Sequence, residues 1–126
     1  MKLRIKGNSL RLRVSRSEAA HLIHTGRLQE TIQFAREDSA TLTYALELSA
    51  EAVEMTLRYR PLEVTVTLPT LEALRWFESD QVGLYRVAAI GNETVALAVE
   101  KDFACLDGSD ADSEDAYENP NRGKSC

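Results

Sequence analysis

The feature that most constrains the fold is the alternation of apolar and basic side chains over the first fourteen residues. The apolar members are Leu3, Ile5, Leu10, Leu12 and Val14. A period of two is typical of strands with one buried face. Gly7-Asn8 interrupts the alternation, and both residue types tolerate the positive φ that a two-residue hairpin turn needs. The sequence therefore predicts an N-terminal β-hairpin.

A two-residue turn also predicts the register of the two strands. Ile5 then faces Leu10 and Leu3 faces Leu12, so apolar meets apolar. On the other face, Arg4 is opposite Arg11 and Lys2 is opposite Arg13. Like charges directly opposite one another in a sheet cost up to about 1 kcal/mol a pair. The hairpin therefore needs a counter-charge.

Two sources of counter-charge are open. The internal source is Glu47, Glu54 and Glu63 on the polar faces of their own strands, or the acidic C-terminal residues. The external source is a phosphate or nucleic-acid ligand, whose charge Lys and Arg neutralise. The candidate anion-binding residues are Lys2, Arg4, Lys6, Arg11 and Arg13. No aromatic residue lies among them in the sequence, which argues against stacking on single-stranded bases.

The charge of the chain is unevenly spread. The net charge is −5, yet residues 1–16 hold six bases and no acid. Residues 107–126 hold six acids against two bases and lack periodicity. We expect one domain over residues 1–106 and an acidic tail over 107–126 that is mobile or docked at the periphery. The overall acidity counts against strong nucleic-acid binding.

Two short helices are expected between the strands. Ser15 and Glu18 have capping-box spacing, so a helix over 17–25 should end at Gly26. Pro69-Thr70 opens a second helix that should bury Leu71, Leu74 and Phe77, with Trp76 at the edge of its apolar face as a core residue or an interface anchor.

The remaining periodic segments predict strands. They cover residues 28–34, 41–48, 53–59, 62–68, 84–90 and 94–100. The last two surround Gly91-Asn92 and are apolar on both faces, so we expect this hairpin to lie centrally and to be covered on two sides. The fold class is α+β, a mainly antiparallel sheet or half-barrel with two short helices.

The order ββαββ occurs twice, which is compatible with a tandem duplication. Leu10, Leu12 and Val14 would then correspond to Leu62, Val64 and Val66, an offset of 52 residues.

A zinc site is a further candidate. His21 and His24 lie three residues apart on the first helix and could share a metal with Cys105 and Cys126. The alternative is a pair of surface histidines, because the cysteines follow no Cys-x2-Cys pattern. No cofactor is expected, since no glycine-rich phosphate loop or nucleophile pattern is present.

Two cysteines suit a reducing compartment, and no apolar run is long enough for a signal peptide or a membrane span. A cytoplasmic, membrane-free protein is expected.

Four segments resemble an uncharacterised family of small bacterial proteins, a domain of unknown function. They are residues 1–18 (MKLRIKGNSLRLRVSRSE), 75–85 (RWFESDQVGLY), 99–107 (VEKDFACLD) and, more loosely, 115–120 (DAYENP). The resemblance implies a bacterial cytoplasmic domain and implies no catalytic residue.

These patterns favour a non-enzymatic interaction module in which a sheet face or edge binds a protein partner and the acidic tail regulates access. The alternative is an anion, phosphate or nucleic-acid binding module that uses the basic hairpin.

Overall fold

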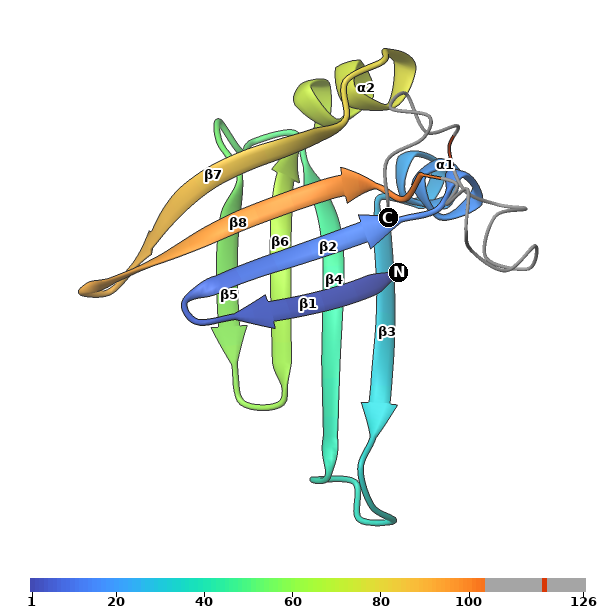
Figure 1. Ribbon diagram of the computed structural model, residues 1–126. Helices are drawn as coiled ribbons and strands as arrows, with labels where there is room; N and C mark the ends of the chain where they lie inside the picture. The colour runs from blue at the N-terminus through green and yellow to red at the C-terminus, as the bar shows by residue number, and fades with distance from the viewer. Residues whose placement is uncertain (104–116, 118–126) are drawn as a thin grey trace.

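The structure is a computed structural model that describes residues 1–103 and residue 117. It contains eight strands and two helices (Figure 1). In chain order they are β1 (Lys2–Lys6), β2 (Ser9–Val14), α1 (Arg16–Thr25), β3 (Arg27–Gln33), β4 (Thr41–Ser49), β5 (Thr56–Arg60), β6 (Glu63–Pro69), α2 (Thr70–Glu78), β7 (Gly83–Ile90) and β8 (Glu93–Lys101). The predicted α+β class is confirmed.

The strands form two four-stranded sheets. Sheet A has the order β1-β2-β8-β7 and sheet B the order β3-β4-β6-β5. Each sheet joins two antiparallel hairpins through one parallel contact, β2 with β8 and β4 with β6. The strands of sheet A cross those of sheet B steeply, and both helices lie at one end of the two layers (Figure 1). The architecture is thus a two-layer sandwich.

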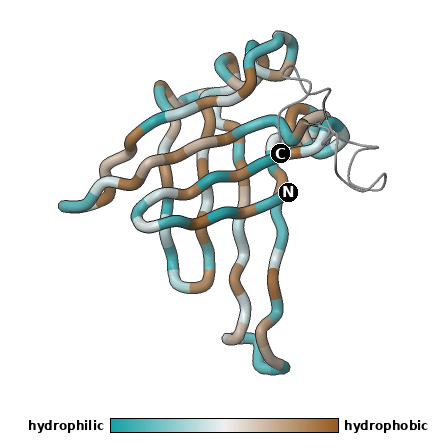
Figure 2. Tube along the Cα trace, in the orientation of Figure 1, coloured by the Kyte–Doolittle hydropathy of each residue, from teal (hydrophilic) through white to brown (hydrophobic). Residues whose placement is uncertain are grey.

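The N-terminal hairpin has the predicted register. Ile5 pairs with Leu10, Leu3 with Leu12, Arg4 with Arg11 and Lys2 with Arg13. Gly7 supplies the positive φ, at 54°. The alternation of hydrophobic and hydrophilic residues along β1 and β2 is visible in Figure 2. The two opposed like-charge pairs therefore exist and share the outer face of sheet A.

The ββαββ order is repeated in space as well as in sequence. Gly7-Asn8 and Pro61-Leu62 form the equivalent turns, and Ser15 and Pro69 are the equivalent helix N-caps. Both correspondences give an offset of 54 residues, so the predicted offset of 52 is wrong. A shift of two residues leaves every side chain on the same face of a strand, so alternation alone cannot separate the two offsets.

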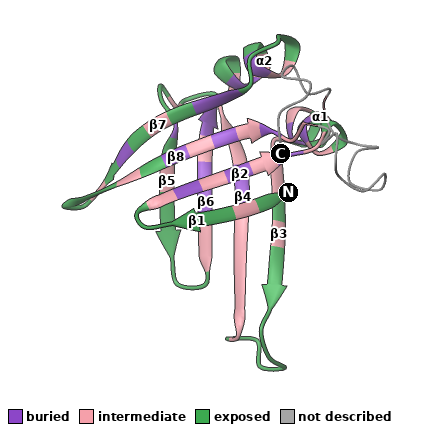
Figure 3. Ribbon diagram, viewed as in Figure 1, coloured by how far each residue is buried: buried purple, intermediate pink, exposed green. Residues whose placement is uncertain are grey.

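The core lies between the sheets at the end nearest the helices (Figure 3). Leu12 and Val14 of sheet A, and Leu46 and Val66 of sheet B, are at most 1% exposed. Trp76 is fully buried, and its Nε1–H donates to the Val82 carbonyl at 3.2 Å. Trp76 is therefore a core residue.

The second helix buries a face that is rotated from the predicted one. Ala73 and Trp76 are buried and Leu74 and Phe77 are half-buried, whereas Leu71 is 70% exposed. The Trp76 side chain has more apolar surface to remove from water than the Leu71 side chain, so the helix turns its Trp76 side towards the core.

The β7–β8 hairpin is central only in part. Strand β8 lies inside sheet A, but β7 is an edge strand. Tyr85 and Val87 face solvent, at 59% and 64% exposure, and Ala96 of β8 is exposed on the same face. The predicted cover on both faces is wrong because sheet B packs against only the inner face of sheet A, where Leu84, Ala88, Leu97 and Val99 are buried.

Candidate functional site

The five predicted anion-binding residues lie together on the outer face of sheet A. Lys2, Arg4 and Lys6 extend from β1, and Arg11 and Arg13 from β2. Three of them have counter-charges supplied by β8 and the residue that follows it. Glu100 forms ion pairs with Arg11 at 3.2 Å and Arg13 at 3.3 Å, and Asp102 pairs with Lys2 at 2.8 Å. The parallel pairing places Glu100 beside Arg13.

The remaining two bases of this face are Arg4 and Lys6. Neither has an ion pair within residues 1–103 and 117 of the structure. The five bases and the two carboxylates, Glu100 and Asp102, sum to +3. The face therefore keeps an excess of positive charge at the end near the Gly7-Asn8 turn.

The counter-charge of the three paired bases is internal, but the three glutamates predicted to supply it do not do so. Glu47 and Glu63 pair with Arg27 and Arg58 on the outer face of sheet B, and Glu54 pairs with Arg86. The position of a glutamate on the polar face of its strand does not predict which sheet that strand joins. The predicted contribution of residues 107–126 lies outside the described residues.

A groove runs along the same outer face. Its floor is Ala96 and Ala98 of β8, and its walls come from β2 and β7. The side chains of Tyr85 and Val87 lie on one side, and those of Ser9 and Arg11 on the other. The volume is about 380 Å³, which lies within the usual range of small-ligand sites. Small side chains on the central strand thus produce a hollow between two taller rows.

A second, smaller hollow adjoins the first. Arg4, Lys6, Ser9 and Arg11 line it, and its volume is about 190 Å³. Ser9 and Arg11 belong to both hollows. The result is one continuous surface that is apolar beside Tyr85 and cationic beside Arg4 and Lys6.

Tyr85 is held in place by Glu100. Its hydroxyl donates to the carboxylate at 2.6 Å. Burial, this hydrogen bond and the charge of Glu100 raise the pKa of Tyr85 to about 12, although Arg11 and Arg13 act in the opposite direction. Gly83 makes the arrangement feasible, because a Cβ there would meet the Tyr85 hydroxyl at 2.9 Å and the Val99 carbonyl at 2.7 Å. The ring therefore leans low across the sheet over Gly83.

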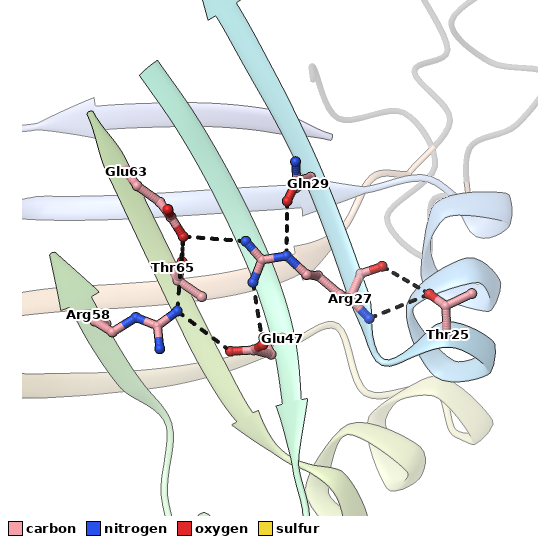
Figure 4. Close-up of polar contacts among 7 residues, drawn as sticks. All are labelled: Thr25, Arg27, Gln29, Glu47, Arg58, Glu63 and Thr65. Carbon is pink, nitrogen blue, oxygen red and sulfur yellow. Dashed lines mark hydrogen bonds and ion pairs between the residues drawn. The ribbon is translucent and has the colours of Figure 1, made fainter. Parts of the chain in front are cut away.

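The outer face of sheet B carries a closed charge network instead of a hollow (Figure 4). Arg27 lies 3.4 Å from both Glu47 and Glu63, and Arg58 lies 3.9 and 4.0 Å from them. The hydrogen bond from Thr65, followed by the nearby Arg27 and Arg58, holds the pKa of Glu63 below its ordinary value even though burial opposes this. Two bases and two acids pair with each other here, so the network itself is neutral.

The predicted zinc residues are not assembled by the described chain. His21 and His24 are exposed on α1, and Cys105 and Cys126 lie outside the described residues. Among residues 1–103 and 117, no three His, Cys, Asp or Glu side chains lie close enough to hold a metal ion. The prediction therefore gains no support from the geometry.

Lys101 is almost fully buried at the end of α2, where its Nζ donates to the Ser79 carbonyl at 2.6 Å. A cation at a helix C-terminus is favourable. Burial lowers its pKa, although Asp80 acts against this. Tyr117 packs over this ammonium and over Arg16, with its ring edge-on to Phe103. These contacts connect one tail residue to the end of β8.

A second exposed surface lies on the inner face of sheet B. Towards the helices this face is buried by sheet A, but the opposite ends of β3–β6 extend past β1 (Figures 1 and 3). Ile32 and Tyr59 are 46% and 66% exposed there, and Phe34 follows Ile32 at 67%. Ile5 of β1 lies on the inner face of sheet A, as its cross-strand partner Leu10 does, and is 62% exposed. We call Ile5, Ile32, Phe34 and Tyr59 the apolar shelf.

Sequence reasoning missed Tyr85, Glu100 and the groove. The sequence feature that marks the groove is the pair of small residues Ala96 and Ala98. Two small residues form a hollow only if larger side chains flank them on the neighbouring strands. One of these neighbours, β2, pairs with β8 through a parallel contact between residues more than eighty positions apart in the chain.

The protein is thus a small two-layer α+β domain in which two ββαββ halves exchange hairpins. The chain belongs to a family of unknown function, DUF7009, whose model matches residues 1–121. This confirms the resemblance to an uncharacterised family. No curated protein and no solved structure matches the chain. Neither helix in the described residues has the length and apolar character needed to cross a membrane.

Proposed function

We propose that this domain is a non-enzymatic binding module that recognises an anionic ligand on the outer face of sheet A. The observation that carries the proposal is the charge excess at Arg4 and Lys6 beside a hollow that both residues line. Carboxylates of this chain form ion pairs with Lys2, Arg11 and Arg13. Of the opposed Arg4/Arg11 pair, Arg4 therefore still needs a negative partner, which an external anion would supply. We place the module in the bacterial cytoplasm, as the resemblance and the cysteine usage favour.

The test uses inorganic tripolyphosphate and isothermal titration calorimetry at low salt. Arg4→Glu/Lys6→Glu should weaken the affinity roughly tenfold or more, because it converts attraction into repulsion at the contact. The matched control is Arg36→Glu/Arg60→Glu, which changes the net charge equally at exposed residues away from this face. The control should bind like the wild type.

The six acids of residues 107–126 offer an alternative counter-charge, so the experiment removes it. A variant in which all six are neutral serves this purpose: Asp107→Asn, Asp110→Asn, Asp112→Asn, Glu114→Gln, Asp115→Asn and Glu118→Gln. It should bind tripolyphosphate at least as well as the wild type, and better if the tail regulates access. Absence of binding by both proteins, or equal weakening in the control, would contradict the proposal.

A protein partner at the apolar shelf is the second candidate. The shelf continues directly into the core, since Tyr44 and Val64 in the same rows of sheet B are half-buried and pack against core residues. An apolar surface continuous with a core is typical of permanent homodimers. Its rim also carries both signs, with Arg36, Glu37 and Asp38 in the β3–β4 loop, as a self-complementary contact requires. The occupant proposed is a second copy of this chain.

Sedimentation velocity over a range of concentrations tests this candidate. Wild type should be dimeric, and Phe34→Asp should be monomeric because a carboxylate cannot be buried unpaired in the contact. Leu71→Asp is the control, since Leu71 is equally exposed on α2 but outside the shelf. A monomeric wild type at all concentrations would exclude the second copy.

A further inference from the structure

We propose that the anion recognised on sheet A is a nucleotide unit, with its base against Tyr85 in the groove and its phosphates at Arg4 and Lys6. This inference rests on the proposed anion-binding function and names its ligand class. The nucleotide can be free or part of a single strand, and the experiment distinguishes the two.

The first argument is the pairing of an aromatic residue with the basic residues, which the sequence does not show. Tyr85 is absent from the basic hairpin in the chain, but β8 alone separates its strand from β2. Tyr85 and Arg11 line the same groove. A stacking ring beside cations that reach the backbone phosphates is the arrangement that sequence-tolerant single-strand binding uses.

The second argument is the rigidity of Tyr85. The hydrogen bond to Glu100 and the missing side chain at Gly83 hold the ring low across the sheet. More than half of the residue remains exposed. A ring that is already ordered loses little rotamer freedom when a base stacks on it, so the stacking energy is retained as affinity.

The third argument is the shape of the groove. Its two walls belong to β2 and β7, which lie two strand spacings apart, about 9–10 Å between backbones. The floor between them is made of methyl groups. A flat ring fits this width, and the adjoining hollow at Arg4 and Lys6 lies where the ligand's charged part would continue.

An acidic peptide fits the same surface less well. Extended peptides bind sheets mainly through backbone hydrogen bonds to an open edge. The groove lies over β8, which is hydrogen-bonded to β2 on one side and β7 on the other. Recognition here depends on side chains alone, which favours a ligand that brings a planar ring and a phosphate.

The acidity of the whole chain does not oppose this inference. The outer face itself sums to +3, and charges farther away than about 8 Å are largely screened at physiological ionic strength. The closed network of Arg27, Arg58, Glu47 and Glu63 lies on the other sheet. The local field is therefore the relevant one.

The test measures fluorescence anisotropy of a fluorescein-labelled decathymidylate at low salt, with the tail-neutral variant as background. Tyr85→Ala should weaken binding roughly 5- to 100-fold, while Tyr85→Phe, which keeps the ring, should stay within about twofold. Ala98→Leu should weaken binding by filling the groove, and Ala89→Leu, on the same face but outside the groove, should not. Circular dichroism and thermal unfolding confirm that each variant is folded.

Competition identifies the source of the nucleotide. Displacement of the oligonucleotide by thymidine monophosphate at micromolar concentration supports a free nucleotide, whereas displacement only by unlabelled oligonucleotide supports a single strand. Better displacement by polyglutamate or by double-stranded DNA would overturn the inference.

The failure of this inference is distinguishable from that of the proposed function. If tripolyphosphate binding depends on Arg4 and Lys6 but Tyr85→Ala leaves oligonucleotide binding unchanged, the anion site stands and the nucleotide assignment falls. If neither tripolyphosphate nor the oligonucleotide binds, both fall.

Discussion

At the scale of the residue, Glu100 is the centre of the candidate site. Its carboxylate contacts Arg11, Arg13 and the Tyr85 hydroxyl, which come from strands on both sides of β8. The same carboxylate forms ion pairs with two bases and orders the only exposed aromatic ring on this face among the described residues. Glu100 thus separates the face into an internally paired part and a part free to bind.

Tyr85 should titrate later than a free tyrosine. Its pKa is raised to about 12, so its contribution to stability is fully present below pH 10 and is lost as pH rises through 12. The tyrosinate absorbance of wild type minus that of Tyr85→Phe isolates this residue from Tyr44, whose pKa is also raised. Glu100→Gln should move the pKa of Tyr85 towards 10. A Tyr85 titration near pH 10 in the wild type would contradict the hydrogen bond to Glu100.

At the scale of the element, the two helices begin in different ways. Ser15 caps α1 by accepting from the Glu18 amide, and the Glu18 carboxylate accepts from the Ser15 amide at 2.9 Å. Glu18 also pairs with the Met1 ammonium. Burial raises the pKa of Glu18, but the hydrogen bonds from that ammonium and from Ser15 outweigh it and lower the pKa. Helix α2 has Pro69 at the same position and no side-chain cap.

Ser15→Ala should lower the free energy of unfolding by about 1 kcal/mol, because the Glu18 amide loses its acceptor. Urea unfolding measures this change. Ser39→Ala in the exposed β3–β4 loop is the control and should change stability by less than about 0.5 kcal/mol. Equal effects of the two substitutions would show that the cap contributes nothing specific.

At the scale of the whole molecule, the two halves exchange hairpins. The first half supplies β1–β2 to sheet A and β3–β4 to sheet B, and the second half supplies β5–β6 to sheet B and β7–β8 to sheet A. Every sheet therefore depends on both halves. The groove follows from this exchange, because its Ser9–Arg11 wall and its Tyr85–Val87 wall come from different halves.

Neither half should fold alone. Fragments 1–52 and 53–126 each lack half of both sheets, and the cut lies in the segment between β4 and β5. Circular dichroism should show no cooperative unfolding for either fragment, and mixing them at equal concentration should restore it, because the parallel β2–β8 and β4–β6 contacts reform. Cooperative unfolding of one fragment by itself would contradict the dependence of each sheet on both halves.

The local features of this protein can be predicted from its amino-acid sequence. The Gly7-Asn8 turn predicted the register of the first hairpin, the Ser15–Glu18 spacing predicted the start of α1, and the alternation predicted most of the strands. These follow from interactions between residues close in the chain. The five bases of the candidate site were named for the same reason.

The residues that lie beside those bases depend on the tertiary fold. Glu100 and Tyr85 reach Arg11 because β8 joins β2 in parallel, and Glu47 and Glu63 are occupied by Arg27 and Arg58 on the other sheet. The alternation of apolar and polar residues predicts which side chains share a face of a strand. The order of the strands in a sheet depends instead on how all the apolar faces of the chain pack together. That order leaves Arg4 and Lys6 next to a groove rather than next to a carboxylate.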